Sequence, residues 1–496
     1  MNMNGMDAGG ARGQTPGGHV GEGDPGMRVF KPPDAAPGTP PSLSSEPGIG
    51  EVQFMENAIS GSLTDGTTPL KYSAFLAAAS NNHQAAFQNA LDALASSGTA
   101  AYRRYLDLEG ARVVLSAPVT LPTAATDNIT SVYNGEIAAD PSFSGTHLIT
   151  GINPGSLQYR FVNVTFNGSN VTSWLKWNQG NLLFFNCHFY YCDTDGTAGL
   201  FADNIATFYL RGCRFWAGDR DVLPTSRTRV AVHAVGDSAG DQKISSCVFA
   251  HFKHAIIYDA FTLLMTDCHI FQGRPADTAT DAYTAGIKLT RGTVGAMIVN
   301  LYLDKCFVEI SNETNPDTDA IGGLHIIGMK TLSVVSDDNF AFIRVRDYHG
   351  QTNLKVQNII LVGCQFSHTG NAVVTPTALH NSQNFDRASY EGISMRACTF
   401  SSKVTPQSNP AYMRKTFGPV TTHNFDFTGN LPFAGRPREV ISIVGNRSGG
   451  SAQHLERGAI SGSTVDITSP AAWAGDITVG ITCNNPEPNS GGFFSG

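Results

Sequence analysis

The chain has 496 residues, of which 15% are charged, and a formal net charge of −8 at pH 7. An acidic protein is a poor general partner for nucleic acid, because surfaces that bind phosphate are normally basic. No apolar run in the sequence approaches the roughly 20 residues of a membrane span. The 52 glycines are typical of a β-protein that is rich in turns.

Residues 1–50 form the first segment, which contains 12 glycines and 8 prolines. Such a composition cannot bury enough apolar surface to offset the entropy lost on ordering, so we expect a flexible arm. Two interpretations stay open: a linker, or an arm that orders only on a partner. Residues 1–5 lack the charged start and apolar core of a secretory signal, so we expect no export by the general secretory route.

Residues 51–125 are expected to form a capping region. Residues 83–94 are rich in alanine and carry large apolar residues at helical spacing, which predicts an amphipathic helix. Alternating strands should follow at 105–108, 112–115 and 119–122. A helix placed before such strands would cover an open sheet end that could otherwise pair with another chain.

A short phrase recurs through residues 126–430: a cysteine followed two positions later by a large apolar residue. Side chains alternate faces in a strand, so both residues of each copy point the same way. Seven copies at an irregular period predict stacked positions on successive coils of a parallel β-helix. The alternative is a β-sandwich or barrel with accidental cysteines. The repeated cysteines are Cys187, Cys213, Cys247, Cys268, Cys306, Cys364 and Cys398.

These cysteines predict free thiols, because side chains on stacked strands run parallel, about 4.8 Å apart, and do not converge. No pair has the CxxC spacing of a zinc or redox site, so we expect no metal and no cofactor. Free thiols also favour assembly in a reducing cytoplasm. The step of 58 residues from Cys306 to Cys364 has room for two coils, and Asp338 falls on a cysteine slot there unless the register slips.

Residues 431–496 are expected to form a small β module and a loose, glycine-rich tail. Two alternating runs, at 440–444 and 476–482, predict its strands.

The chain resembles the pectate-lyase-like right-handed β-helix superfamily. The resemblance rests on residues 86–94, 106–110 and 119–122; Gly110 is kept, whereas the proline and tyrosine that flank it in the family signature are absent. The layout of arm, capping helix, β-helix and C-terminal module is most similar to bacteriophage tailspikes. The resemblance implies a homotrimer in the virion that attaches to host-surface polysaccharide and often cleaves it, with residues 1–50 contacting other virion or tail proteins.

The resemblance also implies that the strand after each cysteine phrase belongs to the sheet that carries the binding groove. If the branched aliphatic residues of these strands face inward, five basic residues face outward on one ladder. A cationic stripe on an acidic protein is a candidate site for acidic sugars, and ordinary solvated surface is the alternative. The five residues are His233, Lys288, His325, Arg344 and Arg346.

Three carboxylates, Asp203, Asp237 and Asp259, close successive strands of the same sheet. If each coil adds one, neighbours lie about 5 Å apart and next neighbours about 10 Å apart. These separations span the roughly 5 Å between the carboxyl groups of retaining glycosidases and the roughly 6.5–9.5 Å of inverting ones. We treat the three as candidate catalytic residues; the alternative is that aspartate is a favourable turn residue at a strand end.

Three functions stay open. The first is a tailspike-like protein that binds host polysaccharide, with or without cleavage by hydrolysis or elimination. The second is a structural virion decoration or adaptor protein without enzymatic activity. The third is a cellular polysaccharide lyase, hydrolase or epimerase, against which the missing export signal and the free thiols count.

Overall fold

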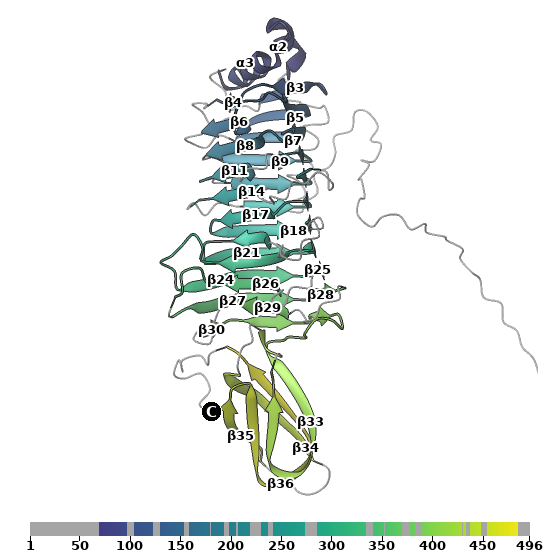
Figure 1. Ribbon diagram of the computed structural model, residues 1–496, viewed down its shortest axis with the longest axis vertical. Helices are drawn as coiled ribbons and strands as arrows, with labels where there is room; N and C mark the ends of the chain where they lie inside the picture. The colour runs from purple at the N-terminus through teal and green to yellow at the C-terminus, as the bar shows by residue number, and fades with distance from the viewer. Residues whose placement is uncertain are drawn as a thin grey trace, which may run out of the picture. The chain divides into compact units, whose positions relative to one another are not determined.

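The computed structural model describes residues 69–96, 104–122, 129–152, 158–178, 180–192, 198–204, 207–218, 230–236, 242–272, 285–333, 341–351, 353–369, 377–381, 389–428, 430–432, 437–447 and 454–484. The predicted fold is confirmed. These residues form a right-handed parallel β-helix with an N-terminal capping helix and a small antiparallel C-terminal sheet (Figure 1). The expected arm at 1–50 lies outside the described residues.

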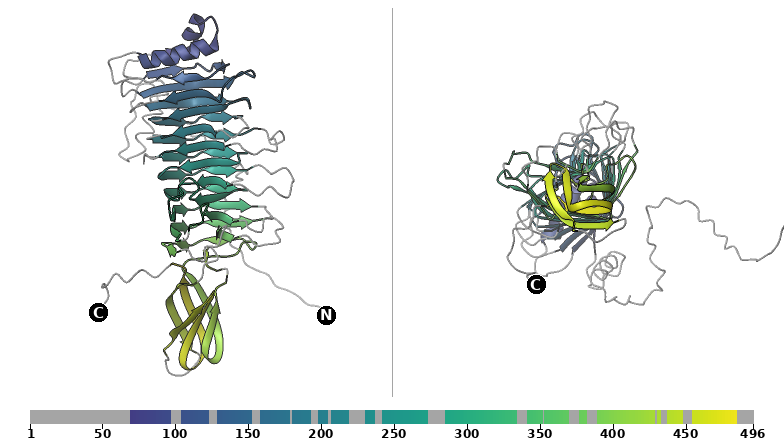
Figure 2. Two further views of the ribbon diagram at one scale, coloured as in Figure 1. Left: turned by 60° about the vertical axis from the view of Figure 1, so that its left-hand side comes forward. Right: turned by 90° about the horizontal axis from the view of Figure 1, so that it is seen from below.

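Each coil passes twice through a 22-stranded sheet and once through a ten-stranded sheet, and every pairing in both is parallel. The coils stack one upon the next along the β-helix (Figure 2). We call the two passages through the larger sheet the first strip and the second strip. The first strip contains β1 (Leu70–Lys71), β2 (Arg104–Asp107), β5 (Ile129–Ala139), β7 (Gln158–Asn167), β9 (Asn181–Phe185), β12 (Thr207–Arg211), β15 (Gln242–Ser245), β18 (Thr262–Thr266), β21 (Thr293–Val299), β24 (Ala320–Ile327), β27 (Lys355–Val362), β30 (Ser389–Glu391) and β31 (Ser394–Arg396).

The second strip contains β3, the C-terminal parts of β5 and β7, and the short strands that follow each bend. Its own strands are β3 (Arg112–Leu115), β10 (His188–Tyr190), β13 (Arg214–Trp216), β16 (Val248–Ala250), β19 (His269–Phe271), β22 (Tyr302–Asp304), β25 (Lys330–Ser333), β28 (Gln365–His368) and β32 (Thr399–Phe400).

The ten-stranded sheet closes each coil. Its strands are β4 (Val119–Leu121), β6 (His147–Ile152), β8 (Ser173–Asn178), β11 (Ala198–Asp203), β14 (Val230–Val235), β17 (His254–Asp259), β20 (Ala285–Leu289), β23 (Phe307–Ser311), β26 (Ala341–Arg346) and β29 (Thr377–Asn381).

A residue with a positive φ turns the chain from the first strip into the second. Asn186 (φ 51°), Gly212 (φ 64°) and Ser246 (φ 52°) each stand directly before a cysteine of the repeated phrase. Only glycine and a few short polar residues adopt this left-handed conformation at low cost. The bend therefore explains why the phrase begins with asparagine, glycine or serine in these coils.

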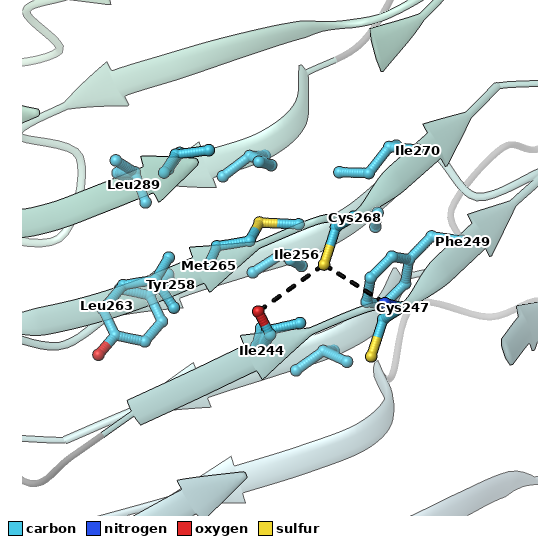
Figure 3. Close-up of a cluster of buried hydrophobic side chains, with 14 of the residues drawn as sticks. Ile244, Cys247, Phe249, Ile256, Tyr258, Leu263, Met265, Cys268, Ile270 and Leu289 are labelled. Carbon is cyan, nitrogen blue, oxygen red and sulfur yellow. Dashed lines mark hydrogen bonds between the residues drawn. The ribbon is translucent and has the colours of Figure 1, made fainter. Parts of the chain in front are cut away.

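The cysteines after these bends stack inside the β-helix as free, mostly buried thiols, as predicted (Figure 3). We call the position directly after the bend the slot of each coil. The residue that follows the slot donates its backbone N–H to the carbonyl oxygen of the slot residue in the preceding coil, for example from Arg214 to Cys187 over 2.9 Å. Two residues further on, Phe189, Phe215 and Phe249 stack with centroid separations of 4.4 and 4.6 Å. The stacked slot is occupied by Cys187, Cys213, Cys247, Cys268, Cys364 and Cys398.

The prediction that Cys306 shares this slot is wrong. Leu301 occupies the slot of that coil, because Tyr302 directly follows it and donates its N–H to Cys268 over 2.9 Å. Cys306 lies after a second bend of the same coil, at Lys305 (φ 60°), and precedes β23 of the ten-stranded sheet.

The long step between Cys306 and Cys364 does contain a further coil, whose slot is filled by Met329. Lys330 N, directly after Met329, donates to Leu301 O over 2.8 Å. Asp338, the residue expected to reach the slot or to mark a register slip, lies outside the described residues.

The predicted capping helix is α3 (His83–Ser96), which follows the short helix α2 (Tyr72–Ala78). Phe87, Leu91 and Leu94 of α3 are fully buried. The amide of Gln88 accepts from Thr120 N and donates to Thr120 O, both over 2.9 Å. The glutamine thus hydrogen-bonds to the first strand of the ten-stranded sheet as a neighbouring strand would. Neither described helix is long and apolar enough to cross a membrane.

The C-terminal sheet is antiparallel. It contains β33 (Ala411–Asp426), β34 (Glu439–Arg447), β35 (Glu456–Ser461) and the long strand β36 (Thr464–Thr482), with which the other three pair. Both predicted strands lie within β34 and β36. The sheet includes β33 and so begins at Ala411, before residue 431, the expected start of the module.

Candidate functional site

The solvent-facing side of the ten-stranded sheet holds four of the five predicted basic residues. His233 in β14, Lys288 in β20 and Arg344 in β26 lie in one column, in which Ile257 and Glu309 take the intervening coils. Arg346 lies two residues after Arg344 and therefore in the neighbouring column. The column is not purely cationic, because a glutamate interrupts it.

His325 does not belong to this group. It lies in β24 of the first strip, paired with Met297 and Ile360, and not in the ten-stranded sheet. The reason is the position of Cys306: the strand directly after it, β23, already belongs to the ten-stranded sheet, so the next strand along the chain returns to the first strip.

An ion-pair cluster surrounds Lys288, whose side chain is 14% exposed. Its Nζ pairs with a carboxylate oxygen of Glu313 and lies 4.0 Å from Oε1 of the buried Glu309. The same Nζ lies 5.3 Å from the ring centroid of Tyr348. Two carboxylates and one aromatic face therefore offset the free-energy cost of burying the lysine charge.

Tyr348 connects this cluster to the arginines. Its hydroxyl donates to Glu309 Oε1 over 3.2 Å, and the guanidinium of Arg346 lies 4.2 Å from its ring centroid. Burial, together with the nearby charges of Glu309 and Glu313, raises the pKa of Tyr348 well above its ordinary value. Tyr348 therefore stays a neutral hydrogen-bond donor across the physiological range.

The two described carboxylates of the predicted catalytic set lie in one column but not in neighbouring coils. Asp203 in β11 and Asp259 in β17 both pair with Val235 of β14, so they are two strand spacings, about 10 Å, apart. Asp259 accepts a hydrogen bond from Thr314 Oγ1 over 2.8 Å. Asp237 lies outside the described residues.

His233 lies close enough to both carboxylates to respond to their charge. Burial lowers the pKa of His233, and Asp259 and Asp203 partly oppose this effect. The imidazole ring meets the ring of Phe201 edge to face, with centroids 5.3 Å apart. At neutral pH the imidazole is thus uncharged and able to accept as well as donate a hydrogen bond.

Sequence reasoning missed the acidic and aromatic members of this site. Glu309 alternates with Val308 and Ile310 in β23, and that alternation predicts an outward-facing carboxylate. Tyr348 follows β26, where no periodic pattern marks it. Within the described parts of the chain, no group of three or more histidine, cysteine, aspartate or glutamate side chains could hold a metal ion.

Comparison with known proteins adds likenesses of fold. No protein-family model matches the chain, and no curated protein matches it. ORF18 of Geobacillus virus E2 is 13% identical, with 87% of this chain and 82% of that chain covered and a TM-score of 0.49. The tailspike protein of Acinetobacter phage vB_ApiP_P1 is 12% identical, with coverages of 85% and 87% and a TM-score of 0.38.

The Gp54 tailspike of Acinetobacter baumannii bacteriophage AP22, solved in complex with a capsular saccharide of that host, is 10% identical; 87% of this chain and 97% of that chain are covered, with a TM-score of 0.33. Two of these three structures are named as phage tailspikes. At such identities and TM-scores, the likeness does not extend to individual residues.

Proposed function

We propose that the protein is a tailspike-like virion protein whose β-helix binds host-surface polysaccharide, as a homotrimer. Depolymerisation of that polysaccharide is a separable second part of the proposal, and attachment to other virion proteins through residues 1–50 is a third. The observation that carries the proposal is the face of the ten-stranded sheet. Consecutive coils there present Lys288, Glu309 and Arg344 in one column beside Arg346 and Tyr348.

Such a face suits a long, hydroxylated and charged polymer. Parallel coils repeat at the strand spacing of about 4.8 Å, so equivalent side chains can contact successive units of a chain that lies along the stack. Cations held by neighbouring carboxylates and aromatic rings keep a fixed geometry, which limits the entropy lost on binding. The acidic protein thus offers local positive charge to acidic sugars without a basic surface overall.

The catalytic part rests on Asp203 and Asp259. Their separation of about two strand spacings lies near the upper end of the roughly 6.5–9.5 Å that inverting glycosidases use to place a water molecule. In this arrangement one carboxyl group would protonate the leaving oxygen, while the other would activate the water. His233, between them in the neighbouring column, would donate or accept a hydrogen bond to the sugar.

A purely structural virion role is the second candidate, and one observation favours it. Lys288 is already paired with Glu309 and Glu313, so the cluster also serves to fasten successive coils together. In that case the protein would bind no polysaccharide.

The test is incubation of the purified protein with capsular polysaccharide and with lipopolysaccharide from candidate hosts. Retention of the polysaccharide by immobilised protein reports binding, and a shift to shorter chains in size-exclusion chromatography reports cleavage. Asp203→Asn and Asp259→Asn should keep binding and lose cleavage. Glu136→Gln, a carboxylate of the second strip, is the matched control. Absence of binding to every polysaccharide would favour the structural role.

A further inference from the structure

A second solvent-facing surface, on the second strip, is rich in aromatic rings. The third residues of its strands form one column along successive coils. The column reads Tyr190, Trp216, Ala250, Phe271 and Asp304. Trp216 has 36% of its surface exposed, although tryptophan is usually well covered in folded proteins.

The rings in the middle of this column form one continuous platform. Ala250 is small, and the imidazole of the next residue, His251, fills the space beside it. The His251 ring lies 4.6 Å from that of Trp216 and 5.1 Å from that of Phe271, nearly perpendicular to both. Lys305 Nζ lies 5.0 Å from the centroid of Phe271 and borders the platform on its far side.

Hydrogen-bonding groups lie beside the platform. Asp304 is next to Phe271 in the column, and His269 and Tyr302 lie in the adjacent column with ring centroids 4.6 Å apart. Within the part of the chain that the structure describes, the buried atoms Asp304 Oδ1 and His269 Nε2 have no hydrogen-bond partner. Burial raises the pKa of the Asp304 carboxyl group. Unmet hydrogen-bonding capacity beside perturbed titratable groups is typical of functional sites.

We propose that this aromatic strip, from β13 to β22, is a saccharide-binding site separate from the face of the ten-stranded sheet. This inference rests on the proposed function, since it assumes a polysaccharide ligand. Trp216 and Phe271, two coils apart, lie under alternate sugar rings of a chain that runs along the stack. Asp304 and His269 take part in hydrogen bonds with its hydroxyl groups.

The chemistry favours a sugar over a second copy of this chain as the occupant. A pyranose ring has apolar C–H faces and a rim of hydroxyl groups, which matches aromatic rings beside hydrogen-bonding side chains. A protein partner would favour exposed aliphatic side chains, and none of those that the structure describes lies in the aromatic strip. Four of them lie on the first strip, Leu264, Met297, Ile327 and Val362, and three lie in the C-terminal sheet, Val420, Ile441 and Val444.

Tryptophan fluorescence tests this site directly. Of the four tryptophans of the chain, Trp174, Trp177 and Trp473 are buried, so Trp216 is the one that a ligand can cover. The polysaccharide retained in the preceding test is titrated into the protein, and quenching of the emission by acrylamide is measured. Binding should protect Trp216 from acrylamide, and Trp216→Phe should remove this signal while keeping the affinity.

Affinities of alanine variants complete the test. Trp216→Ala and Phe271→Ala should each weaken binding by about tenfold, which corresponds to about 1.4 kcal/mol. Phe261→Ala is the control, because Phe261 is 40% exposed but precedes the first-strip strand β18. Unchanged quenching together with full affinity of Trp216→Ala would overturn the inference and leave the proposed function standing.

Two other outcomes also decide against the inference. In the first, Trp216 becomes protected from acrylamide in the absence of saccharide as the protein concentration rises, with a matching rise in molecular mass. That result would show that a second copy of the chain covers the aromatic strip. Failure of the parent protein to bind any polysaccharide would overturn the proposed function and this inference together.

Discussion

At the scale of single residues, His254 makes stability depend on pH. Its Nδ1 lies 2.7 Å from Ala285 O, and burial lowers its pKa to about 4. The unfolded chain takes up a proton near pH 6.5, whereas the folded protein does not. The stability present above that pH is therefore lost progressively as the pH falls towards 4, by about 3 kcal/mol for this residue.

His254→Gln cannot acquire this charge, so its melting temperature should fall less than that of the parent between pH 7.5 and 4.5. His325→Gln, at an exposed histidine of the first strip, is the control and should behave like the parent. If the melting temperatures of the parent and of His254→Gln fall equally between pH 7.5 and 4.5, His254 does not cause the loss of stability in acid.

Thiol chemistry gives a second prediction at this scale. Eight of the nine cysteines are buried and free, and Cys398 is half-buried. A hydrogen bond from the thiol of Cys364 lowers the pKa of Cys398 to about 7, which increases its thiolate fraction. A disulfide exchange reagent at pH 7.5 should therefore modify one thiol quickly in the native protein and all nine after unfolding. Cys398→Ser should abolish the fast reaction, whereas the control Cys187→Ser should keep it. Fast modification of two or more thiols in the native protein would refute the prediction that Cys398 alone is reactive.

At the scale of elements, the end of the ten-stranded sheet depends on Gln88 of α3. Its amide makes two hydrogen bonds to the backbone of Thr120 in β4. Gln88→Ala should destabilise the protein by about 1–2 kcal/mol, the net value of two such bonds, and should promote self-association through the uncovered strand. Asn89→Ala, at an exposed position of the same helix, is the control. Thermal melting and light scattering measure both effects, and equal behaviour of the two variants would show that the capping bonds contribute little.

The stack of strands could be predicted from sequence because burial selects the same residue types coil after coil. A cysteine followed two positions later by a large apolar residue marked six of these positions correctly. Cys306 was misplaced because each coil has two bends, and both can combine a residue of positive φ with a small buried residue, as Asn186 with Cys187 and Lys305 with Cys306 show.

That single error of register moved His325 onto the wrong sheet, because β23, directly after Cys306, already belongs to the ten-stranded sheet and the next strand returns to the first strip. Arg344 and Arg346, one coil further on, were assigned to the correct sheet. The aromatic strip was not predicted from the sequence, for a different reason. Trp216, Phe271 and Asp304 lie 55 and 33 residues apart in the chain, and only the parallel register of β13, β16, β19 and β22 brings them into one column.

At the scale of the whole molecule, the proposed homotrimer needs an interface, and the C-terminal sheet offers exposed apolar side chains for it. Tyr412 in β33 and Val444 in β34 are each 62% exposed, more than the other large hydrophobic residues that the structure describes. Val444 lies within residues 431–496, where we expect much of the subunit contact. Removing everything from Pro432 would be a poor test, because β33 would lose its partner β36 and unfold for that reason alone.

A point substitution separates assembly from folding. Val444→Arg adds a charge to a solvent-facing position, so the monomer should fold normally, whereas a trimer that buries this position would have to desolvate the charge. We expect the parent to be a trimer in size-exclusion chromatography with light scattering, and Val444→Arg to be a monomer with an unchanged circular dichroism spectrum. Val362→Arg, at a 37% exposed position of the first strip, is the matched control and should stay trimeric. If Val362→Arg dissociates while Val444→Arg stays trimeric, the subunit contacts lie along the aliphatic residues of the first strip instead. A monomeric parent would refute the proposed trimer.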